Sequence, residues 1–249
     1  MKSLEVRVLG PLEVIRPDGT LVEPSAWRTG KTMDLLRILA LENNQPVRSS
    51  SLVGLLWPDV DPAHGRGSLR TAASTIRAAV GQDVVTRQHG DLVLVSASVD
   101  LDDYRDLVAA VSRATARGDD HEAMLLIEAA EALYRGDFRA NDDGQRWATF
   151  AREEFRRLRQ RSLTDATTCA LRLGHFREAL ELAYATVRLD PSSESAHRAL
   201  MRAHAELSEI GQALMIFETY RTRLSEELGI DPSRETKELH LKILQDQDR

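Results

Sequence analysis

Cysteine is nearly absent from this sequence of 249 residues, and long hydrophobic runs are absent altogether. Cys169 is the only cysteine, which excludes an internal disulfide and a zinc site built on several thiolates. No apolar run approaches the length of a membrane-spanning helix, and the N-terminus lacks the hydrophobic core of a signal peptide. We therefore expect a cytoplasmic protein with no membrane contact.

Acidic residues are absent between Pro62 and Gly81, although they outnumber basic residues in the chain, whose net charge is −6. Residues 1–98 hold eleven Lys and Arg against ten Asp and Glu, a net of +1. Residues 99–249 hold twenty-two against twenty-nine, a net of −7. Because charges act mainly within a Debye length, an acidic second part joined to a locally basic first part suits a protein with two kinds of partner.

The acid-free stretch has the pattern of one amphipathic helix. Asp61 can cap its start, with Pro62 at the first helical position, and Gly81 can end it. One buried stripe is indicated by the spacing of Leu69, Ala73, Ile76 and Val80. The opposite face is small or hydroxylated, and it is flanked by Arg66, Arg70 and Arg77.

Two short apolar runs follow this helix, Val84-Val85 and residues 92–95, around a turn that contains Gly90. Arg87 and His89 lie at the tip of the turn. A helix followed by a hairpin, both basic at their exposed edges, is typical of a winged helix-turn-helix, with one helix for the DNA major groove and a wing for the backbone or minor groove. The alternative is an alanine-rich core helix followed by an ordinary hairpin.

The residues before this helix predict a small sheet and two further helices. Residues 4–15 alternate as a strand pair broken at Gly10-Pro11, and a third short strand is expected near Leu21-Val22. Residues 29–43 are helical in period, and Ser50 or Ser51 is expected to cap a short helix that Trp57-Pro58 ends.

From about residue 100 onward the periodicity is helical throughout. Helices are predicted over about 102–117, 120–134, 145–173, 175–188, 193–207, 210–227 and 233–246. A shift of 34 residues superposes Ala179 on Ala213 and Leu173 on Leu207. That period is typical of tetratricopeptide helix pairs, whose concave faces bind protein segments.

No fragment completes a catalytic motif. The Gly30-Lys31-Thr32 segment has Ser25 where a phosphate loop needs glycine. His197 and His204 lie two helical turns apart, too far to chelate one ion unaided. We expect no enzymatic activity, no cofactor and no metal ion.

Several motifs together resemble those of the Streptomyces antibiotic regulatory protein (SARP) family. In the first part they are LGPLEV at 9–14, LWPD at 56–59, the SLR run with IRAAVG that ends at Gly81, and VTR at 85–87. In the second part they are LYRGDF at 133–138, Trp147, LDP at 189–191 with Glu194, AHRALM at 196–201 and EELGIDPS at 226–233. The family's wing usually carries an aromatic residue after its glycine, whereas Asp91 stands here.

The resemblance implies an OmpR-like winged-helix DNA-binding domain over 1–97 and a tetratricopeptide-like bacterial transcriptional activator domain (BTAD) over 98–249. The fold class is α+β followed by all-α. Because the sequence contains no nucleotide-binding ATPase segment after the activator domain, we expect the small type of the family, without ATP control. The family implies a transcriptional activator that binds direct repeats near promoters, recruits RNA polymerase through its sigma and alpha subunits, and regulates antibiotic or other secondary-metabolite pathways.

The residues themselves suggest how DNA would be held. Arginines of the acid-free helix would grip phosphates or guanine edges, and its hydroxyls would meet bases or phosphates. The wing tip would reach the backbone or minor groove, and the start of the short helix would hold a phosphate. The predicted DNA-binding residues are Arg66, Arg70, Thr71, Ser74, Thr75, Arg77, Arg87, His89, Arg48 and Ser50.

Two protomers on a direct repeat would lie head to tail, so we expect a second protomer on DNA, with the bound protein on the nucleoid. A rival hypothesis is a protein-interaction scaffold, in which the helical repeats bind a partner and the winged domain only docks proteins. Salt-sensitive DNA binding distinguishes the two.

Overall fold

The computed structural model describes residues 3–140 and 145–247. By their contacts these residues form two compact units, and each unit is discontinuous in sequence. The first unit combines residues 1–105 with 132–155, and the second combines 106–131 with 156–249. No helix in the described parts of the chain is both long enough and apolar enough to cross a membrane.

The first unit contains a small mixed sheet. Strands β1 (Leu4–Arg7) and β2 (Glu13–Ile15) pair antiparallel, with Val6 opposite Val14. The third strand is β5 (Ala97–Val99), which pairs parallel to β1 and gives the order β2-β1-β5. The strand predicted near Leu21-Val22 is reduced to one bridge between Ile15 and Leu21. The third place in the sheet belongs instead to β5, which sequence analysis did not predict, because a strand of three residues shows too little alternation to be recognised.

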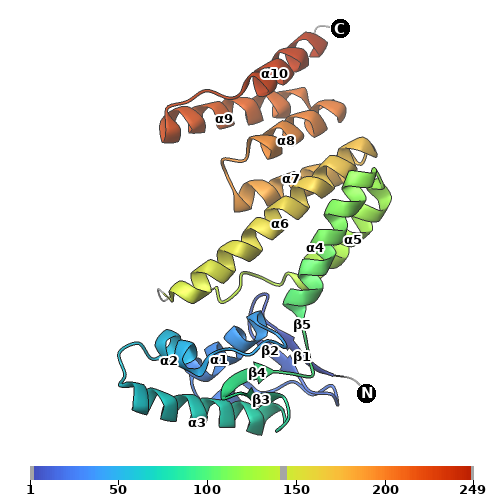
Figure 1. Ribbon diagram of the computed structural model, residues 1–249. Helices are drawn as coiled ribbons and strands as arrows, with labels where there is room; N and C mark the ends of the chain where they lie inside the picture. The colour runs from blue at the N-terminus through green and yellow to red at the C-terminus, as the bar shows by residue number, and fades with distance from the viewer. Residues whose placement is uncertain (1–2, 141–144, 248–249) are drawn as a thin grey trace. The chain divides into compact units, whose positions relative to one another are not determined.

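Three helices and a hairpin complete the winged helix-turn-helix (Figure 1). A 3-10 turn, η1 (Pro24–Trp27), precedes helices α1 (Gly30–Leu41), α2 (Ser49–Leu56) and α3 (Pro62–Val80), and the hairpin consists of β3 (Val85–Gln88) and β4 (Asp91–Leu94). Its core is aliphatic, with fully buried side chains at Leu35, Leu36, Leu39, Leu52, Leu56, Leu69 and Ile76.

Close approach of α2 and α3 depends on Gly65. The residue is buried, and a Cβ atom added to it would lie 2.5 Å from Cγ1 of Val53. Because valine is branched at Cβ and stiff at χ1, it cannot move aside without repacking. Gly67, two residues later, has nothing within 4 Å of such a Cβ.

The first unit also includes the segment with the LYRGDF motif, which packs on the loop between β1 and β2. Gly10 has φ +107°, and a Cβ there would lie 3.1 Å from the carbonyl carbon of Arg135. The Arg135 guanidinium pairs with Glu13 at 2.8 Å and donates to the carbonyl of Pro11 at 3.3 Å. Two motifs that are more than 120 residues apart therefore form one contact.

A buried ion pair fastens the same segment to α1. Arg139 donates from Nε and Nη2 to the two carboxylate oxygens of Asp34, at 2.8 and 3.0 Å. Arg37, one turn along α1, contacts the same carboxylate at 3.2 Å. The side chains of Asp34, Arg37 and Arg139 are 4%, 12% and 12% exposed, and burial lowers the pKa of Arg37. The single carboxylate of Asp34 thus contacts two buried guanidinium groups.

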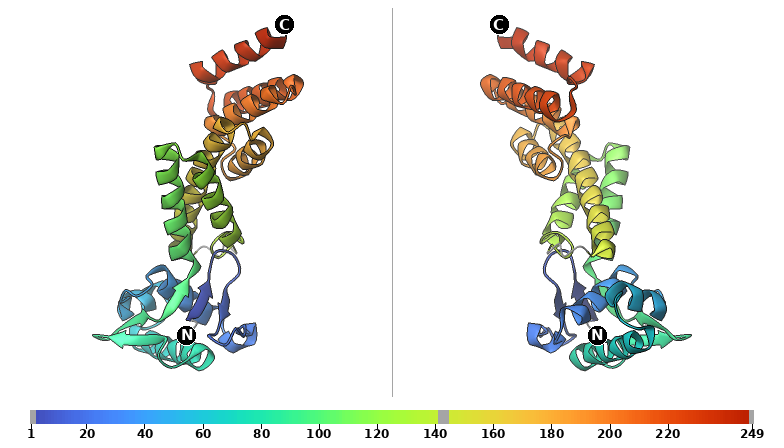
Figure 2. Two further views of the ribbon diagram at one scale, coloured as in Figure 1. Left: turned by 90° about the vertical axis from the view of Figure 1, so that its right-hand side faces the viewer. Right: turned by 90° about the vertical axis from the view of Figure 1, so that its left-hand side faces the viewer.

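Beyond β5 every regular element in the described residues is a helix, and these helices agree within two residues with the predicted ones. They are α4 (Asp100–Arg117), α5 (Asp120–Leu133), α6 (Arg146–Arg172), α7 (Phe176–Leu189), α8 (Glu194–Glu206), α9 (Ile210–Leu228) and α10 (Arg234–Gln247). Within the second unit α7, α8, α9 and α10 stack in sequence order (Figures 1 and 2). Ala179 and Ala213, the superposed positions of the 34-residue repeat, are fully buried between helices.

Candidate nucleic-acid interface

Helix α3 has the boundaries that its sequence predicts. The Asp61 carboxylate accepts hydrogen bonds from the backbone N–H groups of Ala63 and His64, at 2.9 and 3.3 Å. These bonds hold the pKa of Asp61 below its usual value. The predicted stripe is buried, and the helix ends at Gly81, which has φ +120°. The opposite face is therefore presented to solvent along the helix.

That opposite face carries cations and hydroxyls without an acid. Arg66, Arg70, Thr71 and Ser74 are exposed, and Thr75 is half-buried. The hydroxyl of Thr71 donates to the carbonyl of Gly67 at 3.2 Å, and that of Thr75 donates to the carbonyl of Thr71 at 3.0 Å. Their oxygen lone pairs remain available as acceptors, while the guanidinium groups supply donors. The face can thus read a groove edge and bind phosphate.

Two grooves of about 680 Å³ each flank Arg70 and Thr71. Arg16 and Arg28 contribute to one, and Arg28 and Lys31 to the other. Sequence analysis missed these cations because Arg16 and Arg28 directly follow β2 and η1, and Lys31 lies at the start of α1, far from α3 in the chain. The one local signal was the Gly30-Lys31-Thr32 segment, whose threonine lies in the N-terminal turn of α1, which Thr29 caps.

Arg77 has a structural partner. It is half-buried, and its Nε donates to the carbonyl of Val85 at 2.6 Å, which connects the last turn of α3 to the first residue of β3. Only the Nη groups of Arg77 are left for DNA. Arg66 and Arg70 have no such partner among the described residues.

The hairpin has the geometry of a tight wing. Gln88 pairs with Asp91, and the two residues between them, His89 and Gly90, both have positive φ (+51° and +92°), as in a type I′ turn. Arg87 donates from Nη1 to the carbonyl of Gly90 at 2.9 Å. Arg87 and His89 are both exposed, as a wing contact requires.

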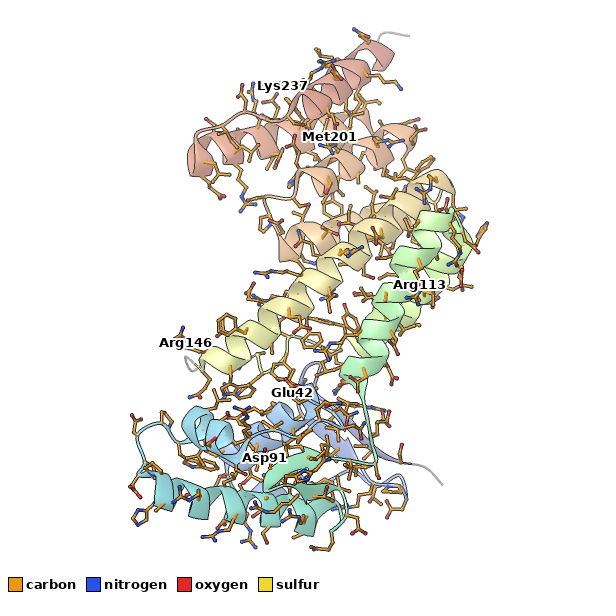
Figure 3. The ribbon with its side chains drawn as sticks, viewed as in Figure 1. Glu42, Asp91, Arg113, Arg146, Met201 and Lys237 are labelled. Atoms are coloured by element: carbon orange, nitrogen blue, oxygen red, sulfur yellow. The ribbon has the colours of Figure 1, made fainter. Side chains whose placement is uncertain are left out.

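The start of α2 differs from the predicted one. The helix begins at Ser49, so Ser50 lies inside it and is not its cap. The cap comes from the wing, because Asp91 (labelled in Figure 3) accepts the backbone N–H of Ser49 at 3.0 Å. The Ser49 hydroxyl also donates to the carbonyl of Gly90 at 2.8 Å. Sequence position alone could not reveal a cap 42 residues away.

The structure brings only part of the predicted site together. Arg70, Thr71, Ser74 and Thr75 line one groove, and Arg66 lies exposed on the same helix. Arg48 and Ser50 are exposed at the start of α2, where the carboxylate of Asp91 already occupies one N–H group and would compete with a phosphate. No group of side chains in the described part of the chain is arranged to hold a metal ion.

Comparison with known proteins identifies relatives of this chain. Residues 99–244 match the family described as the bacterial transcriptional activator domain. The regulatory protein AfsR of Streptomyces griseus is 28% identical over 97% of this chain, which spans only 24% of AfsR. The transcriptional regulator RedD of Streptomyces coelicolor is 24% identical over 97% of this chain and 70% of RedD.

Among solved structures, that of Mycobacterium tuberculosis EmbR in complex with a low-affinity phosphopeptide superposes with a TM-score of 0.83 at 23% identity. The superposition covers 99% of this chain and 66% of EmbR, so the winged helix-turn-helix and the helical repeats share one known fold. The family match and the regulatory relatives lead to one conclusion: the chain belongs to the bacterial transcriptional activator domain family and is of the SARP type.

Proposed function

We propose that this regulator is a sequence-specific DNA-binding activator rather than an enzyme, acting in the cytoplasm on the nucleoid. Residues 1–97 recognise DNA, and residues 98–249 support activation. The observation that carries the proposal is the exposed face of α3, where Arg66 and Arg70 stand without an acid between Pro62 and Gly81. The wing beside α3 supplies a second basic edge.

In this proposal α3 enters the major groove and the wing follows the adjacent backbone or minor groove, as in winged helix-turn-helix proteins. Arg66 and Arg70 bind phosphates or guanine edges, and Thr71, Ser74 and Thr75 meet bases or phosphates. Arg87 and His89 act at the wing, and Arg77 contributes through its free Nη groups. Arg48 and Ser50 approach one phosphate at the start of α2. The net charge of −6 for the whole chain does not oppose this arrangement, because DNA responds to the electrostatic field of the nearby surface, which is basic along α3.

Direct repeats follow from the SARP family rather than from any interface in the chain. Two protomers on a direct repeat lie head to tail, and repeats spaced by one helical turn, ~10–10.5 bp, place both protomers on the same face. Such an arrangement needs no twofold-symmetric dimer in solution. Sedimentation velocity should show a monomer or weak dimer alone and two protomers per duplex when operator DNA is added.

Activation consists of recruiting RNA polymerase through its sigma and alpha subunits, and the regulated genes belong to a pathway for an antibiotic or another secondary metabolite. This part of the proposal rests on membership of the SARP type. Transcription in vitro from a promoter that carries the direct repeat bound by the protein should increase when the protein is added. RNA polymerase whose sigma or alpha subunit lacks the surface that the protein contacts should show no increase.

Selection of bound duplexes from a random pool by the purified chain tests DNA recognition. We expect a direct repeat at helical-turn spacing. Arg70→Ala should either lower the salt dependence of binding by about one counterion, if Arg70 contacts phosphate, or relax one base position at a cost of about 1–3 kcal/mol.

Arg113 is a matched control, because it is exposed on α4 (labelled in Figure 3) and forms no side-chain hydrogen bond or ion pair among the described residues. Arg113→Ala should leave the selected motif, the affinity and the salt slope unchanged. Recovery of no motif, with weak binding that disappears at physiological salt, would instead favour a protein-interaction scaffold.

A further inference from the structure

The second unit contains a groove whose charge is opposite to that of its surroundings. The groove, about 500 Å³, lies between α6, α8 and α10. Its lining includes four cations, Arg172, Arg198, Arg202 and Lys242, and no carboxylate. Residues 99–249 have a net charge of −7, so a groove lined by four cations and no carboxylate differs in charge from this part of the chain as a whole.

Two of the four cations are neutralised outside the groove. Arg172 forms an ion pair with Asp120, and Arg198 forms one with Glu235 at 3.2 Å. These pairs fix the two guanidinium groups in place and leave little net charge on them. The positive character of the groove therefore depends on the other two cations.

Arg202 and Lys242 are exposed, and neither has a hydrogen bond or ion pair within the described part of the chain. Their charges are therefore available to an anionic ligand, whereas an exposed cation without a partner adds little to the stability of the fold.

Apolar side chains also line the groove. They are Leu171 of α6 and Leu239 of α10, and both are half-buried. Thr168 and Ser195 add hydroxyl groups to the lining. A ligand that alternates carboxylates with aliphatic groups would match both features, because arginine binds carboxylates in a planar fork and the leucines cover apolar surface.

We propose that this groove binds an acidic segment of a partner protein, with Arg202 and Lys242 as the residues that pair with its carboxylates. Helical repeats of this kind present grooves to protein segments. Double-stranded DNA is a poorer occupant, because its continuous phosphates would also meet the neighbouring pocket, where three glutamates, Glu194, Glu235 and Glu238, outnumber the two arginines Arg198 and Arg234. The proposal goes beyond DNA recognition by α3 and does not require it.

Fluorescence anisotropy of a fluorescein-labelled peptide of alternating glutamate and leucine, added to the full chain, tests the proposal. We expect saturable binding that weakens as salt is raised, and no binding of the matched glutamine–leucine peptide. Absence of saturable binding up to ~0.1 mM protein, where only very weak complexes remain undetected, overturns the proposal, as does equal binding of the two peptides.

Charge reversal locates the site. R202E combined with K242E should raise the Kd for the acidic peptide at least roughly tenfold, because each attraction becomes a repulsion. R188E is the matched control, since Arg188 is exposed on α7 and does not line the groove. Peptide binding that is unchanged in the double variant, or weakened equally by R188E, contradicts the assignment. The sites in both variants are exposed, and thermal melts should confirm that each variant folds.

DNA binding separates this proposal from the previous one. The double variant should bind the selected duplex with unchanged Kd, whereas Arg70→Ala should lose DNA affinity and keep peptide affinity. Loss of DNA binding in the double variant, without loss of peptide binding, would make the groove a nucleic-acid surface and overturn the peptide assignment.

Discussion

Arginines have opposite surroundings in two parts of the first unit. On α3, Arg66 and Arg70 are exposed and meet no carboxylate among the described residues. At the contact between α1, the β1–β2 loop and the LYRGDF motif, Arg135 and Arg139 are 24% and 12% exposed and bind carboxylates. The residue type is the same, so the supply of carboxylates decides whether an arginine holds the fold or remains free for a ligand.

The two settings differ in energy as well. An exposed arginine contributes little to stability, even when paired, so its loss should affect ligand binding alone. A buried ion pair contributes little net stability but is costly to break, because the remaining charge stays buried without a partner. Variants can therefore separate the two roles.

The largest effect is expected from Asp34→Asn. The substitution keeps the shape of the side chain but removes the carboxylate charge that the guanidinium groups of Arg37 and Arg139 share. We expect the free energy of unfolding to fall by about 3–5 kcal/mol, as when one partner of a buried pair is removed. Urea denaturation measures this loss.

Asp83 provides the control, because it is exposed and its side chain forms no hydrogen bond or ion pair in the described part of the chain. Asp83→Asn should change the free energy of unfolding by no more than about 0.5 kcal/mol. If both variants are equally stable, the ion pair at Asp34 does not hold the segment.

The Asp34–Arg139 pair also shows what sequence can and cannot predict here. The helices could be predicted because 3.6-residue periodicity and capping residues are local signals, and the repeat could be found because Ala179 and Ala213 are one period apart. Contacts between residues 105 positions apart leave no local signal. For the same reason Arg16, Arg28 and Lys31 were missed beside α3, although Arg70 and Thr71 were found.

The next effect concerns the two glycines of α3. Gly65→Ala should lower the free energy of unfolding by about 1–3 kcal/mol, because its Cβ overlaps Val53 and overpacking costs this much. Gly67→Ala should raise it by up to ~1 kcal/mol, the difference in helix propensity. Thermal denaturation of the pair measures both changes. Equal shifts for the two variants would show that α2 can move away from α3.

Arg77 lies between the two classes of arginine. Its Nε bond to the carbonyl of Val85 predicts that Arg77→Ala costs about 1 kcal/mol of stability, the net value of a typical hydrogen bond. Arg70→Ala, by contrast, should cost DNA affinity and leave stability unchanged. Urea denaturation and DNA titration of both variants separate the roles. An Arg77 variant as stable as the wild type would return this residue to the purely DNA-binding set.

Asp91 shows why the structure of the wing and the start of α2 could not be predicted independently of each other. The resemblance to the SARP family implies an aromatic residue at this position of the wing, and Asp91 departs from that pattern. In the structure its carboxylate caps α2, so the wing and the start of α2 are joined through this residue. A residue that departs from a family pattern is thus a useful signal, but its partner has to come from the fold.

The smallest expected effect on stability concerns histidines, which, like the arginines, differ in burial between two sites. His197 is buried, stacks on Tyr220 at a centroid distance of 4.2 Å, and donates from Nδ1 to the carbonyl of Ser193 at 2.8 Å. Burial lowers the pKa of His197. Below the unfolded value of about 6.5 the unfolded chain therefore binds more protons than the folded chain, and the free energy of unfolding falls as pH decreases toward the folded pKa.

Replacement of this histidine should flatten that dependence. The loss of stability between pH 7.5 and 5.5 should be smaller in His197→Asn than in the wild type, as measured by urea denaturation at ~0.15 M salt to limit surface electrostatics. His89→Asn, at the exposed wing tip, should retain the wild-type dependence. Parallel pH profiles for the wild type and His197→Asn would mean that the buried ring is not what makes the fold acid-sensitive. A flattened profile in His197→Asn alone would place this histidine, like Asp34, among the groups that hold the fold.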